Sequence, residues 1–270
     1  NADMGSPYLS PYENPAVHRR VSELIRLHSS NPVDVRRATL GECDLAQASD
    51  ILDLGCGFGF WAQELAGRVA QGAVFTGMDA CDRDEAPYRS CIEAAGRRAR
   101  FICTNLVSRL PFDDDSFDLV IAAYSLYFFV HILPEAARVL RPGRRFLAVT
   151  HSESSFVNLL ETLNIAPGSS PLVRRIREFS AENGAAQLAR CFTRVARVDY
   201  LNSLHFSDSE RDDYLEYLRF KLPLLHPGAR YETGLPPELI ERAALALKSE
   251  GRVRVRKDDV LFHCGGPHVP

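Results

Sequence analysis

Three glycines alternate with other residues directly after a short apolar stretch, in the segment Asp53-Leu54-Gly55-Cys56-Gly57-Phe58-Gly59. Ile51–Leu54 predicts a buried strand, and the apolar pattern of Trp61–Val69 predicts the helix that follows it. Glycines at such a turn let backbone N–H groups approach a ligand closely. Asp53 would then lie at a strand end, where open α/β sheets bind ligands. The segment therefore predicts a ligand-binding turn between a strand and a helix.

Two classes of ligand fit this loop. Gly57–Ala62 has the dinucleotide pattern G-x-G-x-x-A, which would suit NAD. Asp79 follows Gly59 by twenty positions and comes directly after the next predicted strand, Ala73–Met78. An acid there can accept hydrogen bonds from ribose hydroxyls of either a dinucleotide or an adenosyl ligand, so it does not separate the two. A glycine-rich turn without a ligand, with Asp79 as a turn or cap residue, is the third interpretation.

Apolar stretches alternate with helical patterns as far as residue 150. This alternation predicts parallel βαβ units in a doubly wound α/β sheet with helices on both faces. Each predicted strand is nearly continuously apolar, as a sheet covered on both faces requires. The strands predicted after Met78 are Arg100–Cys103, Phe117–Ala123 and Arg145–Thr150, with a helix over Pro134–Leu140 that Arg141-Pro142-Gly143 ends.

The second half of the chain is predicted to be mainly helical. Val195–Leu204 and Arg252–Cys264 are its strand candidates, and the predicted helices are Ser154–Leu163, Leu172–Asn183, Ala185–Cys191, Asp208–Leu225 and Pro236–Glu250. We expect four parts. Residues 1–44 form an N-terminal arm, with a helix over Val17–His28, that covers the site; 45–206 form the ligand-binding core; 207–250 form a helical lid insertion; and 251–270 return as the last strand of the core and a tail.

The expected lid has an amphipathic pattern. Tyr214, Leu215, Leu218 and Leu222 fall on one helix face, and charged residues are available for the other. Such a stripe must be buried against something. Either it roofs a pocket together with the arm around Tyr8 and Tyr12, or it packs on the sheet edge or on a partner subunit.

Four motifs in register resemble one family. They are Ile51–Gly59, Gly77–Asp79, Leu110-Pro111-Phe112 with Ser116-Phe117-Asp118, and Val139–Gly143. Over residues 45–151 the series is similar to the class I S-adenosylmethionine-dependent methyltransferases, in the branch with small-molecule acceptors. The resemblance implies a Rossmann-like, seven-stranded, mostly parallel sheet with helices on both faces. It also implies S-adenosylmethionine as the cofactor.

The resemblance also implies roles for single residues. Asp53 and the glycine loop would hold the methionine part, Asp79 the ribose, and Ala80 one face of the adenine. Asn105 stands where the family usually has an acid that contacts the adenine amino group, and its carbonyl can accept the same hydrogen bond. Ala122–Ser125 would face the transferred methyl group. The full cofactor set is Asp53, Gly55, Cys56, Gly57, Gly59, Asp79, Ala80, Asn105, Leu106 and Ala122.

Methyl transfer from a sulfonium chiefly needs an aligned acceptor, with a general base where the acceptor loses a proton. The predicted catalytic candidates are Tyr124, Tyr127 and His151, with His131 as a further possible base. A capping or surface histidine is the alternative for His151, and a core aromatic cluster for Tyr127. The acidic run Asp113–Asp115 reads as a solvated turn, so no metal site is expected.

Composition favours a small-molecule enzyme. The net charge is −3, which disfavours a nucleic-acid acceptor, although an RNA or protein acceptor stays open. The seven cysteines show no paired short spacing, which is typical of reduced thiols in a cytoplasmic protein. No apolar run is long enough to span a membrane, and a monomer or homodimer is expected. The alternatives to a methyltransferase are an NAD-dependent oxidoreductase and a non-catalytic S-adenosylmethionine-binding protein.

Overall fold

A computed structural model describes residues 7–41, 43–105 and 109–268 of the chain. It contains a seven-stranded sheet with the strand order β3-β2-β1-β4-β5-β9-β6 and a separate pair of strands, β7 and β8. β9 is antiparallel to both of its neighbours, and the other strand pairs of the large sheet are parallel. The strands are β1 (Asp50–Leu54), β2 (Val74–Asp79), β3 (Arg98–Cys103), β4 (Phe117–Ala123), β5 (Leu140–His151), β6 (Phe192–Tyr200), β7 (Ser203–Ser207), β8 (Arg252–Arg256) and β9 (Asp259–Pro267).

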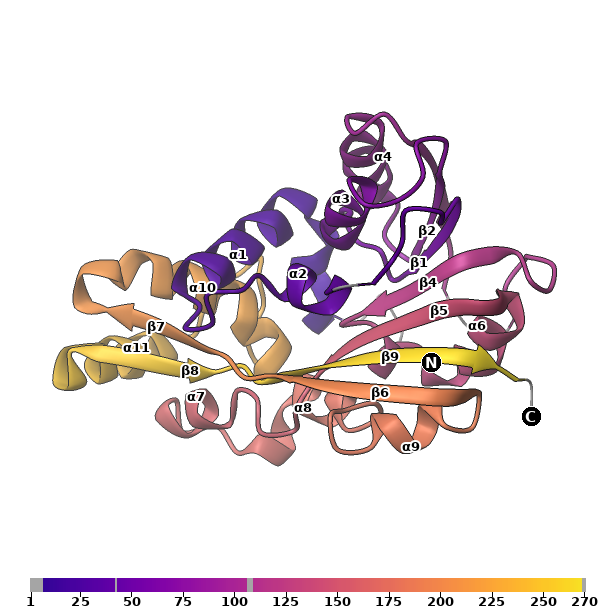
Figure 1. Cartoon of the computed structure of the whole chain (residues 1–270). Coiled ribbons are helices and arrows are strands. Elements are labelled where there is room, and N and C mark those ends of the chain that lie inside the picture. Colours follow the sequence, from indigo (N-terminus) through magenta and orange to yellow (C-terminus); the bar gives the residue numbers. More distant parts are fainter. Residues whose placement is uncertain (1–6, 42, 106–108, 269–270) are drawn as a thin grey trace.

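Helices cover both faces of the large sheet (Figure 1). The α-helices are α1 (Pro15–His28), α2 (Val35–Leu40), α3 (Phe60–Ala66), α4 (Glu85–Glu93), α5 (Leu126–Phe129), α6 (Leu133–Val139), α7 (Val157–Thr162), α8 (Pro171–Ile176), α9 (Gly184–Leu188), α10 (Arg211–Leu225) and α11 (Pro237–Glu250). A 3₁₀ helix, η1 (Pro7–Glu13), precedes α1. The predicted Rossmann-like, mostly parallel seven-stranded sheet is thus confirmed.

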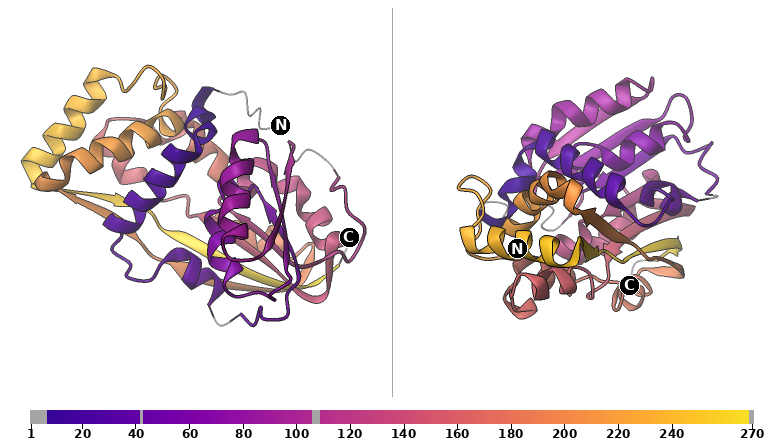
Figure 2. Two further views of the ribbon diagram at one scale, coloured as in Figure 1. Left: turned by 90° about the horizontal axis from the view of Figure 1, so that it is seen from above. Right: turned by 90° about the vertical axis from the view of Figure 1, so that its left-hand side faces the viewer.

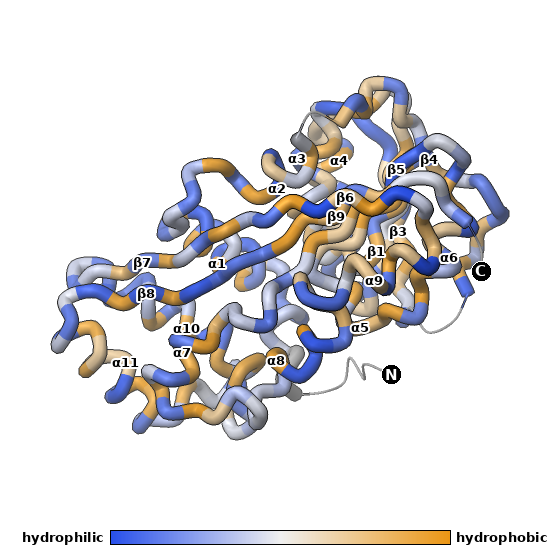
Figure 3. Tube along the Cα trace, turned by 60° about the horizontal axis from the view of Figure 1, so that its bottom comes forward, coloured by the Kyte–Doolittle hydropathy of each residue, from blue (hydrophilic) through white to orange (hydrophobic). Residues whose placement is uncertain are grey.

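The side chains of the central strands point alternately to the two faces of the sheet, so the apolar core has one part on each face. In β1, Ile51 packs with α2, α3 and α4, whereas Leu52 and Leu54 pack with the helices of the opposite face. Successive strand residues point to opposite faces, so a strand that is apolar throughout is buried from both sides. The largest apolar cluster continues from the sheet into α10 and α11. Figure 3 shows the contrast between β9, which is mainly hydrophobic, and β8, which alternates.

A long hairpin extends beyond the large sheet. β6 continues into β7, and β8 into β9, so that the β7–β8 pair projects away from the sheet with α10 and α11 beside it (Figure 1). α1 lies between α10 and the glycine-loop half of the molecule (Figure 2). The segment between β7 and β8, which contains α10 and α11, therefore packs into the same apolar core as the large sheet.

The two long strands predicted in the second half are each interrupted. Leu201 and Asn202 separate β6 from β7, and Lys257 and Asp258 separate β8 from β9. At this break the Asn202 N–H donates to Asp258 Oδ1 at 3.0 Å, and the Lys257 N–H donates to the Asn202 carbonyl at 3.0 Å. Such irregularities re-aim side chains beside functional sites.

Three further sequence predictions need correction. The helix predicted over Leu172–Asn183 ends at Ile176, because the segment after it bonds to β5: the Ala181 N–H donates to the His151 carbonyl. Arg141-Pro142-Gly143 does not precede a strand but lies within β5, which pairs at Leu140 and again from Arg145. The helices α2 and α4 were not predicted; Pro87 in the first turn of α4 is compatible with a helix there.

The amphipathic prediction for residues 211–225 holds in only part of α10. Tyr214, Leu218 and Leu222 are buried and Glu216 is exposed, as expected. All residues from Phe220 to Leu225 are buried, however, because α10 packs against α1, η1, α8, α11 and β7. No helix among the described residues is long and apolar enough to cross a membrane.

Candidate active site

One cavity of about 670 Å³ opens where β1, β2, β4 and β5 end. The glycine loop and Asp79 line one part of it, and His151 lines another. Tyr12 of η1, His18 of α1 and Phe220 of α10 line it from the opposite side. This position at the carboxyl ends of parallel strands is where open α/β sheets bind ligands.

The glycine loop has a backbone that residues with side chains rarely adopt. Gly55, Gly57 and Gly59 have φ angles of +72°, +50° and +89°. A Cβ on Gly55 would lie 2.5 Å from Ser125 Cβ, and one on Gly59 would lie 2.6 Å from Cys91 Sγ. Positive φ and close neighbours both select glycine here. The loop can therefore turn tightly into α3 and present its backbone to the cavity.

Asp79 is fixed by backbone donors. Its Oδ2 accepts the Gly57 N–H at 2.8 Å, and its Oδ1 accepts the Cys81 N–H at 3.1 Å. The carboxylate lines the cavity and keeps lone pairs free, since each oxygen can accept more than one bond. It is thus oriented in advance to accept hydroxyl donors from a ligand.

Two other acids beside this loop are buried without complete partners. Within the described chain, Asp53 Oδ2 and Asp84 Oδ1 are buried and have no hydrogen-bond partner. Burial and the charge of Asp79 raise the pKa of Asp53 to about 8 and that of Asp84 to about 7. Three crowded carboxyls favour a cationic ligand, which would lower these pKa values again.

We predict that Asp53→Asn removes a pH dependence of stability from the ligand-free protein. The folded-state pKa of Asp53 lies above its unfolded value of about 3.9, so folding favours the protonated form. Its contribution to stability is complete below pH 4 and is lost as the pH rises toward 8. One pKa unit corresponds to about 1.4 kcal/mol, so the melting temperature of the wild type relative to Asp53→Asn should fall by several degrees between pH 5 and pH 8.5.

Circular dichroism melts at several pH values check this prediction. Asp113→Asn is the control, because Asp113 is exposed and its replacement should leave the pH dependence of the wild type unchanged. A constant difference between wild type and Asp53→Asn across this pH range would contradict it.

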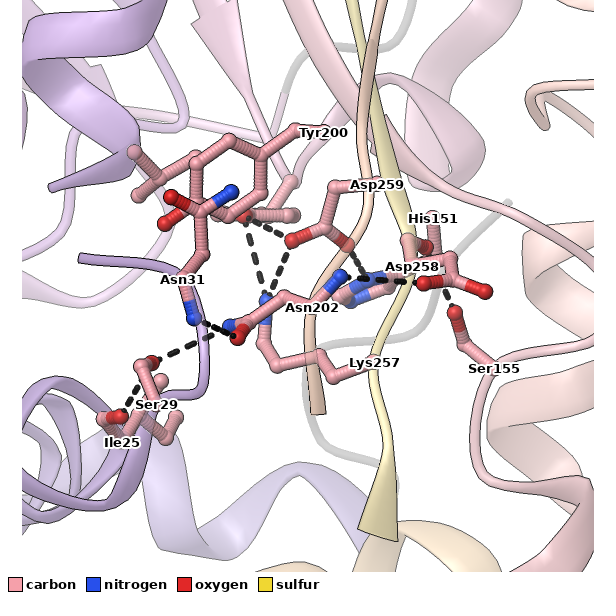
Figure 4. Close-up of polar contacts among 12 residues, drawn as sticks. Ile25, Ser29, Asn31, His151, Ser155, Tyr200, Asn202, Lys257, Asp258 and Asp259 are labelled. Atoms are coloured by element: carbon pink, nitrogen blue, oxygen red, sulfur yellow. Dashed lines mark hydrogen bonds and ion pairs between the residues drawn. The ribbon is translucent and has the colours of Figure 1, made fainter. Parts of the chain in front are cut away.

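The far part of the cavity is organised around Asp259, which is 2 % exposed. His151 Nδ1 lies 2.6 Å from Asp259 Oδ1, and Lys257 Nζ donates to Oδ2 at 2.6 Å (Figure 4). The Tyr124 hydroxyl donates to the same Oδ2 at 2.7 Å. Burial opposes ionisation of Asp259, but Lys257 and His151 hold its pKa at about 2. The ionised Asp259 carboxylate therefore accepts hydrogen bonds from His151, Lys257 and Tyr124.

His151 has the arrangement of a general base. Burial lowers its pKa to about 4 despite the opposing effect of Asp259, so the ring is neutral near pH 7. Nδ1 faces the ionised Asp259, which places the ring proton on Nδ1 and leaves a lone pair on Nε2. No hydrogen bond to Nε2 is formed by the described residues. The alternative of a surface histidine does not hold, because His151 is buried and lines the cavity, and the predicted catalytic role stays a prediction.

Both predicted tyrosines stack on the His151 ring. Tyr124 stacks on His151 with ring centroids 4.7 Å apart, and Tyr127 does so at 6.1 Å. Tyr124 has a φ of +56°, a strained conformation of the kind found at functional sites. Burial and Asp259 raise the pKa of Tyr124 well above its usual range, so it acts as a donor and not as a base. Its hydrogen bond can orient the Asp259 carboxylate.

The predicted cofactor residues divide into two groups. Gly55, Cys56, Gly57, Asp79, Ala80 and Asn105 line the cavity. Asp53 at the end of β1, Gly59 at the end of the loop and Ala122, which is fully buried within β4, do not line the cavity. Leu106 lies outside the described residues. Asp113–Asp115 is exposed, as expected of a solvated turn.

Sequence reasoning missed Lys221, Lys257, Asp259 and His18, all of which lie at or beside the cavity. The rarity of lysine in this chain could have drawn attention to Lys221 and Lys257. The chain has only three lysines, Lys221, Lys248 and Lys257, among 32 basic residues. Two of the three, Lys221 and Lys257, are buried at the cavity.

The part of the chain that contains the glycine loop is similar to a known family of protein domains. Residues 51–143 match the family model of the methyltransferase domain. A demethylmenaquinone methyltransferase of Bacillus cereus is 26% identical over 125 residues, which is 45% of this chain and 53% of that protein. The chain therefore spans about half the length of the curated relatives it matches.

Solved structures of low sequence identity share the fold over nearly the whole chain. The YcgJ protein of Bacillus subtilis is 18% identical, with a TM-score of 0.54, and the match covers 93% of this chain and 100% of that one. The [4+2]-cyclase SpnF is 17% identical, with a TM-score of 0.57, and covers 97% and 98%. At this identity the likeness establishes the fold alone.

Proposed function

Because the chain carries a class I S-adenosylmethionine-dependent methyltransferase domain, we propose that it transfers a methyl group to an oxygen, nitrogen or carbon atom of a small molecule. One observation carries the proposal. A single cavity joins the glycine loop and Asp79 to a buried His151–Asp259 dyad, so a methyl donor and a base can meet in it. A fold that only bound the cofactor would not need the second part.

The residues of the loop fit S-adenosylmethionine, the cofactor of this family. Asp79 and Asn105 both line the cavity, where Asp79 would accept the ribose hydroxyls and Asn105 would contact the adenine. The crowded acids Asp53, Asp79 and Asp84 suit a ligand with cationic groups. When bound, the cofactor supplies a methyl group that its sulfonium has already activated.

His151 and the walls around it would then serve the acceptor. His151 Nε2 can take the proton that an oxygen or nitrogen acceptor loses, while Asp259 stabilises the ring that becomes charged. Tyr127, Phe128 and Phe129 form an aromatic wall of the cavity. Holding acceptor and methyl donor in line can supply about 7–11 kcal/mol of the barrier.

The roof of the cavity supports a small acceptor. Tyr12, His18, Phe220 and Lys221 cover it, and we propose that η1, α1 and α10 act together as a lid that shapes the acceptor pocket. Arg20 of α1 binds Glu216 and Asp213 of α10, which holds the two helices together. A relative is named for demethylmenaquinone, itself a small molecule. A macromolecular acceptor would need a more open site.

Two alternatives were open, an NAD-dependent oxidoreductase and a non-catalytic S-adenosylmethionine-binding protein, and different observations bear on each. The match to the methyltransferase domain removes the reason to favour NAD. A chain that binds S-adenosylmethionine without methyl transfer is a sharper alternative, since one neighbour of the same fold is described as a cyclase. Turnover separates this alternative from the proposal.

The test is transfer of radioactive methyl from S-adenosylmethionine into a small-molecule extract of the source organism, with RNA and protein fractions alongside. We expect label in the small-molecule fraction. Asp79→Ala should weaken cofactor affinity by about 1–3 kcal/mol, through loss of charge-assisted hydrogen bonds, and lower labelling at limiting cofactor. Calorimetry measures the affinity. Label only in RNA or protein, or cofactor binding without any transfer, would overturn the proposal.

A further inference from the structure

Lys221 on α10 is a buried lysine with no use in the mechanism above. The residue is 5% exposed and lines the cavity. Its ammonium lies 5.4 Å from the centre of the Phe156 ring and 5.5 Å from that of Phe220. In the described part of the chain it forms no hydrogen bond or ion pair. A lysine this buried is normally paired, so Lys221 is available to pair with an anion that enters the cavity.

The other charges of this region cannot serve as that partner. Lys257 and Asp259 already form an ion pair at 2.6 Å, so their charges cancel. Burial and, to a smaller extent, the charge of Lys257 lower the pKa of Lys221 to about 7, and Asp259 acts in the opposite direction. His151 and His18 are held neutral by burial. The protonated Lys221 is therefore a buried charge of the cavity without an ion-pair partner among the described residues.

We propose, on the premise of the proposed function, that the methyl acceptor is a carboxylate and that its carboxylate group pairs with Lys221. An anion beside a buried ammonium stabilises its charged form. The aromatic wall of Tyr127, Phe128 and Phe129 would take the apolar body of the molecule. The atom to be methylated would then face His151, whose pKa Lys221 influences across the same space.

The chemistry at Lys221 favours a carboxylate over other anions. One ammonium matches one negative charge, whereas a phosphate with more charge generally recruits arginine clusters or helix N-termini. A simple phenol has a pKa near 10 and would arrive neutral. The carboxylate of the cofactor itself is the competing source of the same group, because Lys221 also influences His18, which lies over Gly57.

The experiment compares size-matched probes with the protein saturated in S-adenosylhomocysteine. The pairs are 4-hydroxybenzoate with 4-hydroxybenzamide, and 2-naphthoate with 2-naphthamide. Binding is measured by calorimetry or by naphthalene fluorescence in the wild type, in Lys221→Met and in Lys248→Met. Lys248 is exposed on α11 and serves as the matched control for loss of a lysine.

We expect at least one carboxylate to bind about tenfold more tightly than its amide in the wild type and in Lys248→Met. The preference should fall to within about threefold in Lys221→Met, with S-adenosylhomocysteine affinity unchanged. Equal binding of carboxylates and amides by the wild type, or a preference that survives in Lys221→Met, would overturn the proposal. Weaker S-adenosylhomocysteine binding in Lys221→Met would assign Lys221 to the cofactor instead.

These measurements involve no turnover, so they are independent of the test of the proposed function. A protein that shows the carboxylate preference but labels no small molecule would retain the inference about Lys221 as a ligand contact and lose the methyl transfer. A protein that methylates a neutral metabolite but shows no preference for carboxylates would retain the methyl transfer and lose the inference about Lys221.

Discussion

His151→Gln should lower the rate of methyl transfer by about 10²–10⁴-fold, the usual contribution of a general base. Glutamine keeps a polar side chain of similar reach but cannot take up the proton that His151 Nε2 would accept. The affinity for S-adenosylhomocysteine should change less than threefold, because the glycine loop and Asp79 lie in another part of the cavity. Single-turnover rates with saturating cofactor measure the chemical step.

His205→Gln is the matched control. His205 lies on β7, is not among the residues that line the cavity, and its replacement should leave the rate within about twofold of the wild type. A wild-type rate in His151→Gln would remove the base from the mechanism and leave alignment of the acceptor as the whole contribution of this part of the site.

The pH dependence gives a second measure of the same residue. Burial holds the pKa of His151 at about 4, so its neutral form persists well below pH 6. At saturating cofactor, kcat/KM for the acceptor should therefore not fall between pH 7 and pH 5. An unperturbed histidine, with a pKa of about 6.5, would lose more than nine-tenths of its basic form over that range.

The cofactor half of the site was readable from the sequence because its signals are local. The turn at Gly55–Gly59 needs positive φ at three glycines, and only a few contiguous residues specify it. Asp79 is fixed by donors from Gly57 and Cys81, in two neighbouring loops at the ends of β1 and β2. The period of apolar residues likewise predicted β4 over its full length, Phe117–Ala123.

Most of the acceptor half of the site could not be predicted from the sequence, because its residues come from segments that are far apart along the chain. His151 and Asp259 are 108 positions apart, and they meet only because β9 inserts beside β5 in the antiparallel sense. The pair His151–Asp259 is in direct register across these strands. The break at Lys257 and Asp258, which interrupts a strand predicted to be continuous, brings Lys257 to the cavity. No local pattern of residue types encodes that register.

Asp259→Asn should lower both the stability of the protein and the rate of methyl transfer. Asp259 is fully ionised and buried, and the change would leave Lys257 as an unpaired buried ammonium. Removal of one partner of a buried ion pair typically costs about 3–5 kcal/mol. The rate of methyl transfer should also fall by about 10²-fold or more, because the His151 ring loses the acceptor that fixes its proton on Nδ1.

The double variant Asp259→Asn with Lys257→Met separates the two effects. Methionine removes the unpaired charge and roughly conserves the apolar volume of the lysine stem, so most of the lost unfolding free energy should return. The rate should not return, since the contact between His151 Nδ1 and a carboxylate is still missing. Urea unfolding and single-turnover kinetics measure the two quantities on the same preparations. A double variant that recovers stability and rate together would show that Asp259 only balances the charge of Lys257, and that His151 works without a carboxylate partner.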